Sequence, residues 1–577
     1  MAKKNNTAPT FAWSDQLILF RYFLDQFGKN SLAALAGKLN NAEYEGVDEN
    51  QNTFFWGELD GLLQRQGSNA KISRDILRGY DENICRYVKQ IGGNRGGIRL
   101  KYFQYIACLF TEMYLDRYFT DKVAFAADLN AFAEKVKNAT LGGIDTQPFK
   151  PENMNKLAFM SATGSGKTLV MHINISQFQH YLKKARLVNP HTVINKIIVL
   201  APNEGMSNQH LTELKLSHIS AEPFSKSGFG TAADVVVIDM NKLKEEGKVK
   251  TVSVDSFEQN NLVLVDEAHR GLAGDVWYDY RSRLSADGGF AFEYSATLKQ
   301  AMKTLNVKKD KELLDEYFRS IIIDYSYKFF YEDGYGKEYR IYNLRDTISD
   351  EQRQLYLTGC LLSFYQQLKL FAEKGKEYAP FQVEKPLLVF VGNRVTAKTS
   401  AAEMTDVEEV LDFIDKFVNA KERTIGRIHA VLNEDTGLYD GKGRELFSQN
   451  FNAITSLFGG TPRATDVYQD ILRVVFNSDT ASDAPRLHVL NLRQVQGEIA
   501  LRIGMDGEYF GVISIGDTSG LIKNCEARGI ATGTEEFANE SLFENINDRS
   551  SNIKVLIGSR KFTEGWNSWR VSTMGLI

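Results

Sequence analysis

Residues 157–172 of this 577-residue chain, Leu-Ala-Phe-Met-Ser-Ala-Thr-Gly-Ser-Gly-Lys-Thr-Leu-Val-Met-His, determine how the rest of the sequence is interpreted. The apolar run 157–160 predicts a buried strand, and the apolar spacing from Leu169 to about Lys183 predicts a helix. A short stretch rich in glycine and hydroxyl residues separates them. Strand, glycine loop and helix in this order are the context of a phosphate-binding P-loop, whose backbone N–H groups close on phosphate oxygens.

The loop supplies candidate ligands for ATP and for its metal ion. Lys167 is expected to reach the β- and γ-phosphates, and the Thr168 hydroxyl is expected to bind Mg²⁺. Ser161 stands where the general pattern has glycine, but a looser pattern that allows Ser or Ala there fits the chain. A chance glycine turn is the weaker interpretation, because a predicted strand and helix flank the loop directly. The predicted ATP-binding residues of the loop are Thr163, Gly164, Ser165, Gly166, Lys167 and Thr168.

A second predicted strand, 261–265, ends in Asp266-Glu267-Ala268-His269. Open parallel sheets place their ligands at the carboxyl ends of the strands, so these side chains are candidates for catalysis. Asp266 is expected to hold the Mg²⁺ that bridges the phosphates, and Glu267 to orient and deprotonate the attacking water. His269 is a candidate relay to the neighbouring domain. Taken alone, an acidic pair at a strand end is often only a helix cap.

A third strand end carries Ser295-Ala296-Thr297, after the predicted strand 290–294. Small hydroxyl side chains at this position could hydrogen-bond the acidic motif and pass its state onward. The tripeptide alone does not indicate a function. Its position after the P-loop and the Asp-Glu-Ala-His motif is what makes it a strong candidate.

Gln104 lies in the helix predicted from Arg99 to about Tyr118, before the P-loop strand. Its amide has both the donor and the acceptor needed to read an adenine edge. An exposed helix residue is the simpler interpretation of Gln104 considered without the other motifs.

Near the end of the chain, the predicted strand 553–557 is followed by Gly-Ser-Arg-Lys-Phe-Thr-Glu-Gly-Trp-Asn at 558–567. A Glu-Gly turn brings the backbone close to a phosphate or ribose, which makes Glu564 and Gly565 candidate ATP-binding residues. The candidate nucleic-acid contacts are Arg394, Arg560 and Lys561. A solvated turn explains the last two of these equally well.

The bulk properties restrict the class of protein. Net charge is −4 and the isoelectric point is near 6.2, so no global basic signature indicates nucleic acid, although a local patch suffices for binding. The four cysteines form no Cys-x-x-Cys pair, which favours a reducing compartment without a zinc cluster. Neither a signal-peptide pattern nor a membrane-length apolar run is visible, so we expect a cytoplasmic protein without a membrane partner.

With these motifs in this order, the chain resembles the superfamily 2 helicases and translocases, and most closely the restriction (Res, motor) subunit of type III restriction enzymes. The matching segments are 99–104, 161–168, 201–202, 266–269, 295–297, 385–391 and 558–567. The resemblance implies an α/β fold of two RecA-like P-loop domains with parallel sheets, after a small helical domain. The expected divisions are a helical domain at 1–95, an ATP-binding RecA-like domain at 96–305, a linker at 306–337, and a second RecA-like domain with a helical insertion at 338–577.

The resemblance also implies ATP and Mg²⁺ as cofactors, DNA as the main partner, and a methyltransferase (modification) subunit as a candidate protein partner. Two features of the family are missing: the helicase motif Gln-x-x-Gly-Arg-x-x-Arg and the nuclease signature. Gln494-Val-Gln-Gly497-Glu498 is a decoy for the first, because Glu498 stands where arginine belongs. We therefore expect an N-terminal fragment of a longer protein.

Three functions follow as hypotheses. The leading one is an ATP-dependent DNA translocase or helicase motor of a type III-like restriction or defence system, that is, an ATP hydrolase. The alternatives are an RNA-directed helicase of the same superfamily and a nucleotide-gated nucleic-acid-binding module without turnover.

Overall fold

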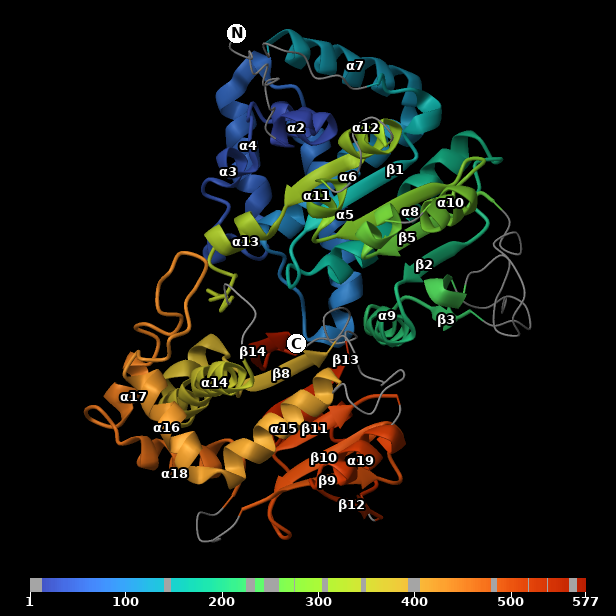
Figure 1. Cartoon of the computed structure of the whole chain (residues 1–577). Coiled ribbons are helices and arrows are strands. Elements are labelled where there is room, and N and C mark those ends of the chain that lie inside the picture. Colours follow the sequence, from blue (N-terminus) through green and yellow to red (C-terminus); the bar gives the residue numbers. More distant parts are fainter. Residues whose placement is uncertain are drawn as a thin grey trace, which may run out of the picture. The chain divides into compact units, whose positions relative to one another are not determined.

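The computed structural model contains two compact units, Met1–Glu338 and Tyr339–Ile577, each built around one seven-stranded sheet (Figure 1). The residues that the structure describes are 13–139, 147–224, 234–242, 259–273, 275–303, 310–343, 349–392, 405–478, 485–516, 518–536, 538–559 and 568–576. The predicted α/β fold class is confirmed.

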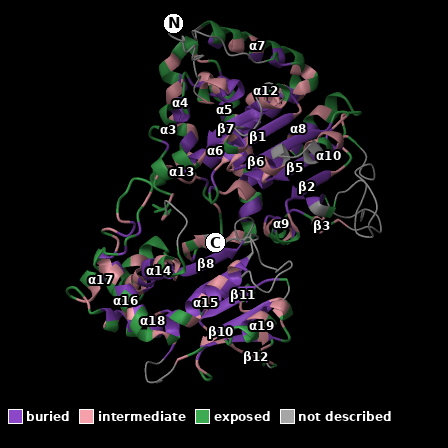
Figure 2. Cartoon of the chain, viewed as in Figure 1, coloured by how far each residue is buried: buried purple, intermediate pink, exposed green. Residues whose placement is uncertain are grey.

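The sheet of the first unit has the strand order β3-β4-β2-β5-β6-β1-β7, and every pair in it is parallel. Its strands are β1 Lys156–Ser161, β2 Ile197–Ala201, β3 Ala221–Pro223, β4 Val235–Asp239, β5 Leu262–Asp266, β6 Phe290–Ser295 and β7 Ile321–Tyr325. Most of these strands are apolar runs that are buried along their length, as Figure 2 shows, because helices cover a parallel sheet on both faces.

The helices of the first unit begin before the sheet and share its hydrophobic core. They are α1 Trp13–Gln16, α2 Ile18–Gln26, α3 Leu32–Ala36, α4 Phe54–Gln66, α5 Arg74–Gly92, α6 Tyr102–Thr120, α7 Lys122–Ala139, α8 Lys167–Val188, α9 Glu204–Leu216, α10 Asp275–Leu284, α11 Leu298–Lys303, α12 Lys311–Ser320 and α13 Tyr327–Glu332. The rings of Phe23 on α2 and Phe110 on α6 stack with centroids 5.3 Å apart. Helix α2 also packs against β7, so residues of the range expected to be a linker, 306–337, contribute a strand to this sheet.

A chain of buried side chains joins the sheet to the helix that follows the P-loop. The Tyr294 hydroxyl on β6 donates to Asn174 Oδ1 on α8 (2.6 Å), and Asn174 Nδ2 donates to Gln177 Oε1 (2.7 Å). Gln177 Nε2 in turn donates to Glu112 Oε1 on α6 (2.9 Å). All four side chains are buried, so their mutual hydrogen bonds replace the water that each has lost.

Glu112 on α6 connects three helices through this series of hydrogen bonds. Its second carboxylate oxygen accepts hydrogen bonds from Asn83 on α5 (2.9 Å) and from the Tyr181 hydroxyl on α8 (2.8 Å). Burial raises the pKa of Glu112 to about 7, although these hydrogen bonds oppose the shift. The carboxyl group therefore titrates near neutral pH inside the core.

The sheet of the second unit has the order β12-β9-β10-β11-β13-β8-β14. Its strands are β8 Leu387–Gly392, β9 Leu487–Leu492, β10 Glu498–Ile503, β11 Gly511–Ser514, β12 Ala531–Glu535, β13 Val555–Ser559 and β14 Val571–Leu576. Its helices are α14 Asp350–Tyr378, α15 Asp406–Asn419, α16 Lys421–Leu432, α17 Asn452–Leu457, α18 Ala464–Val474 and α19 Thr518–Ala527. No helix of the described residues is long and apolar enough to cross a membrane.

The expectation that both sheets are wholly parallel is wrong for the second unit. Strand β10 runs antiparallel to both β9 and β11. The connections on either side of β10 are 493–497 and 504–510. They are too short for the crossover of a dozen or more residues that a parallel pair requires.

Residues 338–342, at the expected start of the second RecA-like domain, form no strand, and Tyr339 and Ile341 are 73% and 67% exposed. The Gln494–Glu498 decoy leads into β10, where Glu498 is buried and accepts the backbone N–H groups of Leu542 (2.9 Å) and Phe543 (3.2 Å). That carboxylate holds the turn before a short 3₁₀ helix.

Replacement of Glu112 by Gln should flatten part of the pH dependence of stability. Because the folded-state pKa is raised from 4.5 to about 7, the contribution of Glu112 to the free energy of unfolding is full below pH 4.5 and is lost as the pH rises through 7. The loss amounts to about 3 kcal/mol at one pKa unit per 1.4 kcal/mol. Urea unfolding between pH 5 and 8 measures it.

The control for this prediction is Glu82→Gln on α5, whose side chain is 57% exposed. The difference in unfolding free energy between wild type and Glu112→Gln should shrink or change sign with rising pH, whereas Glu82→Gln should leave the profile unchanged. A pH-independent difference for Glu112→Gln would contradict the buried titration.

Candidate nucleotide-binding site

The P-loop joins β1 to α8 through two glycines with left-handed backbone. Gly164 has φ +85° and Gly166 has φ +83°, a region that side chains with a Cβ rarely adopt. A Cβ on Gly166 would also lie 2.4 Å from the Gln104 amide nitrogen. Thr163 and Gly164 are exposed, so the tip of the loop is open to a ligand. The local geometry thus requires glycine where the sequence has it.

Gln104 is placed against this loop rather than on the surface. Its Nε2 donates to the Ser165 carbonyl (2.8 Å), and its Oε1 accepts the backbone N–H of Lys101 (2.9 Å). The side chain is 9% exposed. Gln104 therefore fixes the P-loop to the start of α6, and its expected contact with adenine stays a prediction.

The P-loop lysine meets the acidic motif directly. Lys167 Nζ lies 2.9 Å from Glu267 Oε1, and the two side chains are 11% and 20% exposed. Both motifs lie at the carboxyl ends of their strands, β1 and β5, each of which pairs with β6. Glu267 has φ +50°, a left-handed conformation that is uncommon outside glycine and often occurs at functional sites.

The charge state of Glu267 follows from its neighbours. Burial would raise its pKa, but a hydrogen bond from His269 and the charge of Lys167 outweigh burial and lower the pKa to about 2. Glu267 is therefore ionised at neutral pH and is strongly held in this arrangement. A carboxylate with so low a pKa is a weak base.

His269 connects Glu267 to the Ser-Ala-Thr segment. Its Nδ1 is 3.3 Å from Glu267 Oε2 and 2.9 Å from Ser295 Oγ. Ser295 Oγ also accepts the backbone N–H of Thr297 (3.1 Å), which spans Ala296 and fixes the turn. Of the predicted coupling residues, Ser295 contacts the acidic motif through His269, and Thr297 is joined to Ser295 by its backbone N–H.

Asp266 is held from two sides at the end of β5. Its Oδ1 accepts the backbone N–H of Glu267 (2.9 Å), and its Oδ2 lies 3.1 Å from His210 Nε2 on α9. The Asp266 side chain is 8% exposed and that of His210 is 4% exposed. His210 was not among the residues predicted from the sequence. The available signal was a histidine at helical spacing between Met206 and Leu214 on the helix that follows β2.

The donor set fits Mg²⁺, which binds oxygen ligands and is often held by only one or two carboxylates. The Thr168 hydroxyl and the Asp266 carboxylate supply such oxygens, and each is the chain neighbour of one member of the Lys167–Glu267 pair. Among the described residues, the buried hydroxyls of Ser165 and Thr297 have no hydrogen-bond partner. Two unsatisfied hydroxyls beside the P-loop and the acidic motif suit a site that receives a polar ligand.

Five predicted site residues lie outside the described residues, namely Arg394, Arg560, Lys561, Glu564 and Gly565.

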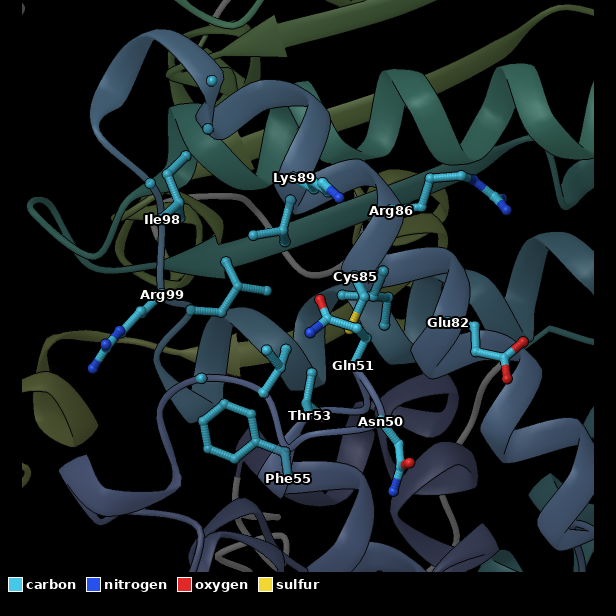
Figure 3. Close-up of a pocket in the computed structure, with 18 residues that line it drawn as sticks. Asn50, Gln51, Thr53, Phe55, Glu82, Cys85, Arg86, Lys89, Ile98 and Arg99 are labelled. Carbon is cyan, nitrogen blue, oxygen red and sulfur yellow. The ribbon is translucent and has the colours of Figure 1, made fainter.

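A separate hollow of about 740 Å³ lies beside the segment that leads to Gln104 (Figure 3). Apolar side chains such as Phe55 and Ile98 line it, and the charged groups of Arg86 and Arg99 point away from it. None of the predicted catalytic or ATP-binding residues that the structure describes lines this hollow.

Comparison with known proteins gives a family for part of the chain. Residues 126–300 match the model of the family "Type III restriction enzyme, res subunit". This range contains the P-loop, the Asp-Glu-Ala-His motif and the Ser-Ala-Thr segment. No curated protein matches the chain.

Three solved structures are similar at low sequence identity and low TM-score. The UvsW helicase of bacteriophage T4 is 17% identical, with 34% of this chain and 70% of that chain covered and a TM-score of 0.20. The Hef helicase domain of Pyrococcus furiosus is 13% identical, with 73% and 86% covered and a TM-score of 0.27. The Sulfolobus solfataricus SWI2/SNF2 ATPase core in complex with dsDNA is 10% identical, with 73% and 83% covered and a TM-score of 0.20.

The family match confirms the resemblance that the motifs predicted, and the parallel sheet with its P-loop agrees with it. Residues 126–300 are accordingly similar to the res subunit of type III restriction enzymes, as the order of the motifs predicted.

Proposed function

We propose that this chain is the ATP-dependent DNA translocase or helicase motor of a type III-like restriction or defence system. The observation that carries the proposal is the contact between Lys167 of the P-loop and Glu267 of the acidic motif. That contact assembles a phosphate-binding cation and a candidate base at one sheet edge. The restriction role rests on the family match of residues 126–300, and it implies a methyltransferase subunit as a partner.

The ion pair explains how ATP binding could start hydrolysis. The γ-phosphate is a stronger partner for Lys167 than a single carboxylate, because it offers several charged oxygens. When Lys167 turns to the phosphate, Glu267 loses a charge that lowers its pKa. The carboxylate then becomes a better acceptor for the proton of the attacking water. In the ion pair, each of the two groups neutralises the charge of the other.

Thr168 and Asp266 would hold Mg²⁺ beside the phosphates. The ion, when bound, neutralises charge on the β- and γ-phosphates. The backbone N–H groups of the loop and the N-terminus of α8 add further positive potential at the same place.

His269 and Ser295 offer a route from the chemistry to movement. His269 contacts both Glu267 and Ser295, so a shift of Glu267 toward water changes its bond to His269. The Ser-Ala-Thr turn then receives that change through Ser295 Oγ. This is the coupling that a motor on a nucleic-acid strand needs.

Lys167→Ala and Glu267→Gln should separate binding from turnover. Lys167→Ala removes the phosphate contact and should abolish both nucleotide binding and hydrolysis. Glu267→Gln removes the base and frees Lys167, so hydrolysis should fall by about 10²- to 10⁴-fold, with nucleotide binding equal to or tighter than wild type. Fluorescent-nucleotide titration and a phosphate-release assay measure the two quantities.

The matched controls are Lys183→Ala, an exposed residue of the same helix, and Glu134→Gln, whose side chain is 68% exposed. Both should behave as wild type. Undiminished hydrolysis by Glu267→Gln would remove Glu267 from the role of base.

Ser295→Ala should impair movement more than hydrolysis. The substitution deletes the hydroxyl that joins His269 to the Thr297 backbone but leaves Lys167, Asp266 and Glu267 in place. Triplex displacement on duplex DNA, normalised to ATP consumed, should fall several-fold. An unchanged ratio of displacement to ATP consumption would contradict the coupling role.

Duplex DNA should stimulate ATP hydrolysis more than duplex or single-stranded RNA does. The measurement is phosphate release at matched nucleotide concentration and fixed salt, since backbone contacts weaken as salt rises. Stronger stimulation by RNA would favour an RNA-directed helicase of the same superfamily. Nucleotide-dependent binding without hydrolysis would favour a binding module.

A further inference from the structure

Helix α9 brings an unassigned histidine to the candidate metal site. Strand β2 pairs with β5 in parallel, Leu200 opposite Val265, so the helix after β2 starts next to the end of β5. The buried residues of α9 recur at helical spacing and are Met206, Ser207, His210 and Leu214. His210 is therefore on the buried face of α9, in the second turn of the helix.

We propose that His210 is a positioning residue that fixes the Asp266 carboxylate for Mg²⁺. The inference rests on the proposed function and deepens it. It depends on the 3.1 Å contact between His210 Nε2 and Asp266 Oδ2. An ionised carboxylate can only accept hydrogen bonds, so the imidazole donates through Nε2.

The two oxygens of Asp266 are held from different directions. The backbone N–H of Glu267 donates to Oδ1, and His210 Nε2 donates to Oδ2. Together these two hydrogen bonds restrict rotation of the carboxylate about the Cβ–Cγ bond. Each oxygen keeps a further lone pair for a metal or for a water bound to it. Mg²⁺ tolerates little departure from octahedral geometry, and a carboxylate fixed in one plane meets that demand.

The groups around His210 favour a single orientation of its ring, in which Nε2 donates to Asp266. Its Nδ1 is buried and has no hydrogen-bond partner among the described residues, so among them Asp266 is the group that the His210 ring hydrogen-bonds. His172 on α8 lies near it, and burial, with the nearby His210 and Arg95, lowers the pKa of His172 to about 3. His172 is thus neutral and its Nδ1 is 2.8 Å from Ser217 Oγ. A neutral imidazole at His172 therefore offers His210 no charged partner.

A purely structural role for His210 makes a different prediction. If the side chain only filled space between α9 and the sheet, its removal would weaken the whole nucleotide site. If it positions Asp266, its removal should weaken metal binding selectively. Loss of a residue that orients a metal ligand typically costs about 10- to 100-fold in metal affinity or activity.

The test compares His210→Ala, His210→Gln and the control His191→Ala in the full chain. Glutamine keeps an amide N–H that can donate to Asp266, and His191 is exposed. Mn²⁺ serves as the probe, and its binding with a non-hydrolysable ATP analogue is followed by electron paramagnetic resonance. Binding of the same analogue without metal is measured by fluorescence, and thermal melting confirms folding.

The expected result is about 10- to 100-fold weaker Mn²⁺ binding by His210→Ala, with metal-free nucleotide affinity changed by less than about 3-fold. His210→Gln should recover most of the metal affinity, and His191→Ala should match wild type. The Mg²⁺ concentration for half-maximal ATP hydrolysis should follow the same order.

Three results would overturn the inference: wild-type metal binding by folded His210→Ala, an equal loss of metal-free nucleotide binding, or a His210→Gln as defective as His210→Ala. Failure of the wild-type chain to bind any nucleotide would instead overturn the proposed function itself.

Discussion

The ion pair between Lys167 and Glu267 exists because β1 and β5 share one neighbour, β6, in a parallel sheet. With all three strands pointing the same way, their last residues arrive at one edge. The P-loop, the acidic motif and the Ser-Ala-Thr turn each follow one of these strands. A single reversed strand would separate the groups by the length of the strand. The site therefore depends on strand order before it depends on any one side chain.

The P-loop helix is fixed at both its start and its middle. At its start, Gln104 holds the Ser165 carbonyl, and at its middle, Gln177 and Tyr181 bond to buried Glu112. The same hydrogen-bond chain reaches Tyr294, directly before Ser295. The helix that presents Lys167 and the strand that presents Ser295 thus share one polar framework. Buried networks of this kind favour one arrangement, because each broken bond leaves an unpaired polar group.

The motifs of the first unit could be predicted from the sequence because each combines a continuous apolar strand with a short polar ending. Asp266, Glu267 and His269 were expected at the end of such a strand, and the structure places these three residues at the end of β5. Their catalytic roles stay predictions. The contact between His210 and Asp266 could not be predicted, because it joins residues whose proximity is set by the β2–β5 pairing. The direction of β10 was missed because short apolar runs do not reveal how strands pair. Strand β7 was missed as well, since Ile321–Tyr325 lies in a range that reads as a charged linker.

The packing of α2 against β7 has a consequence for how the first unit forms during synthesis. Helix α2 ends at Gln26 and β7 begins at Ile321, so the ribosome must make nearly the whole unit before these two elements can meet. Contacts between such distant segments slow folding, because a long loop has to close first. Until then the side of α2 that packs on β7 has no sheet to cover it. That side of α2 therefore stays exposed while the rest of the unit is made, and exposed apolar surface in a nascent chain favours aggregation.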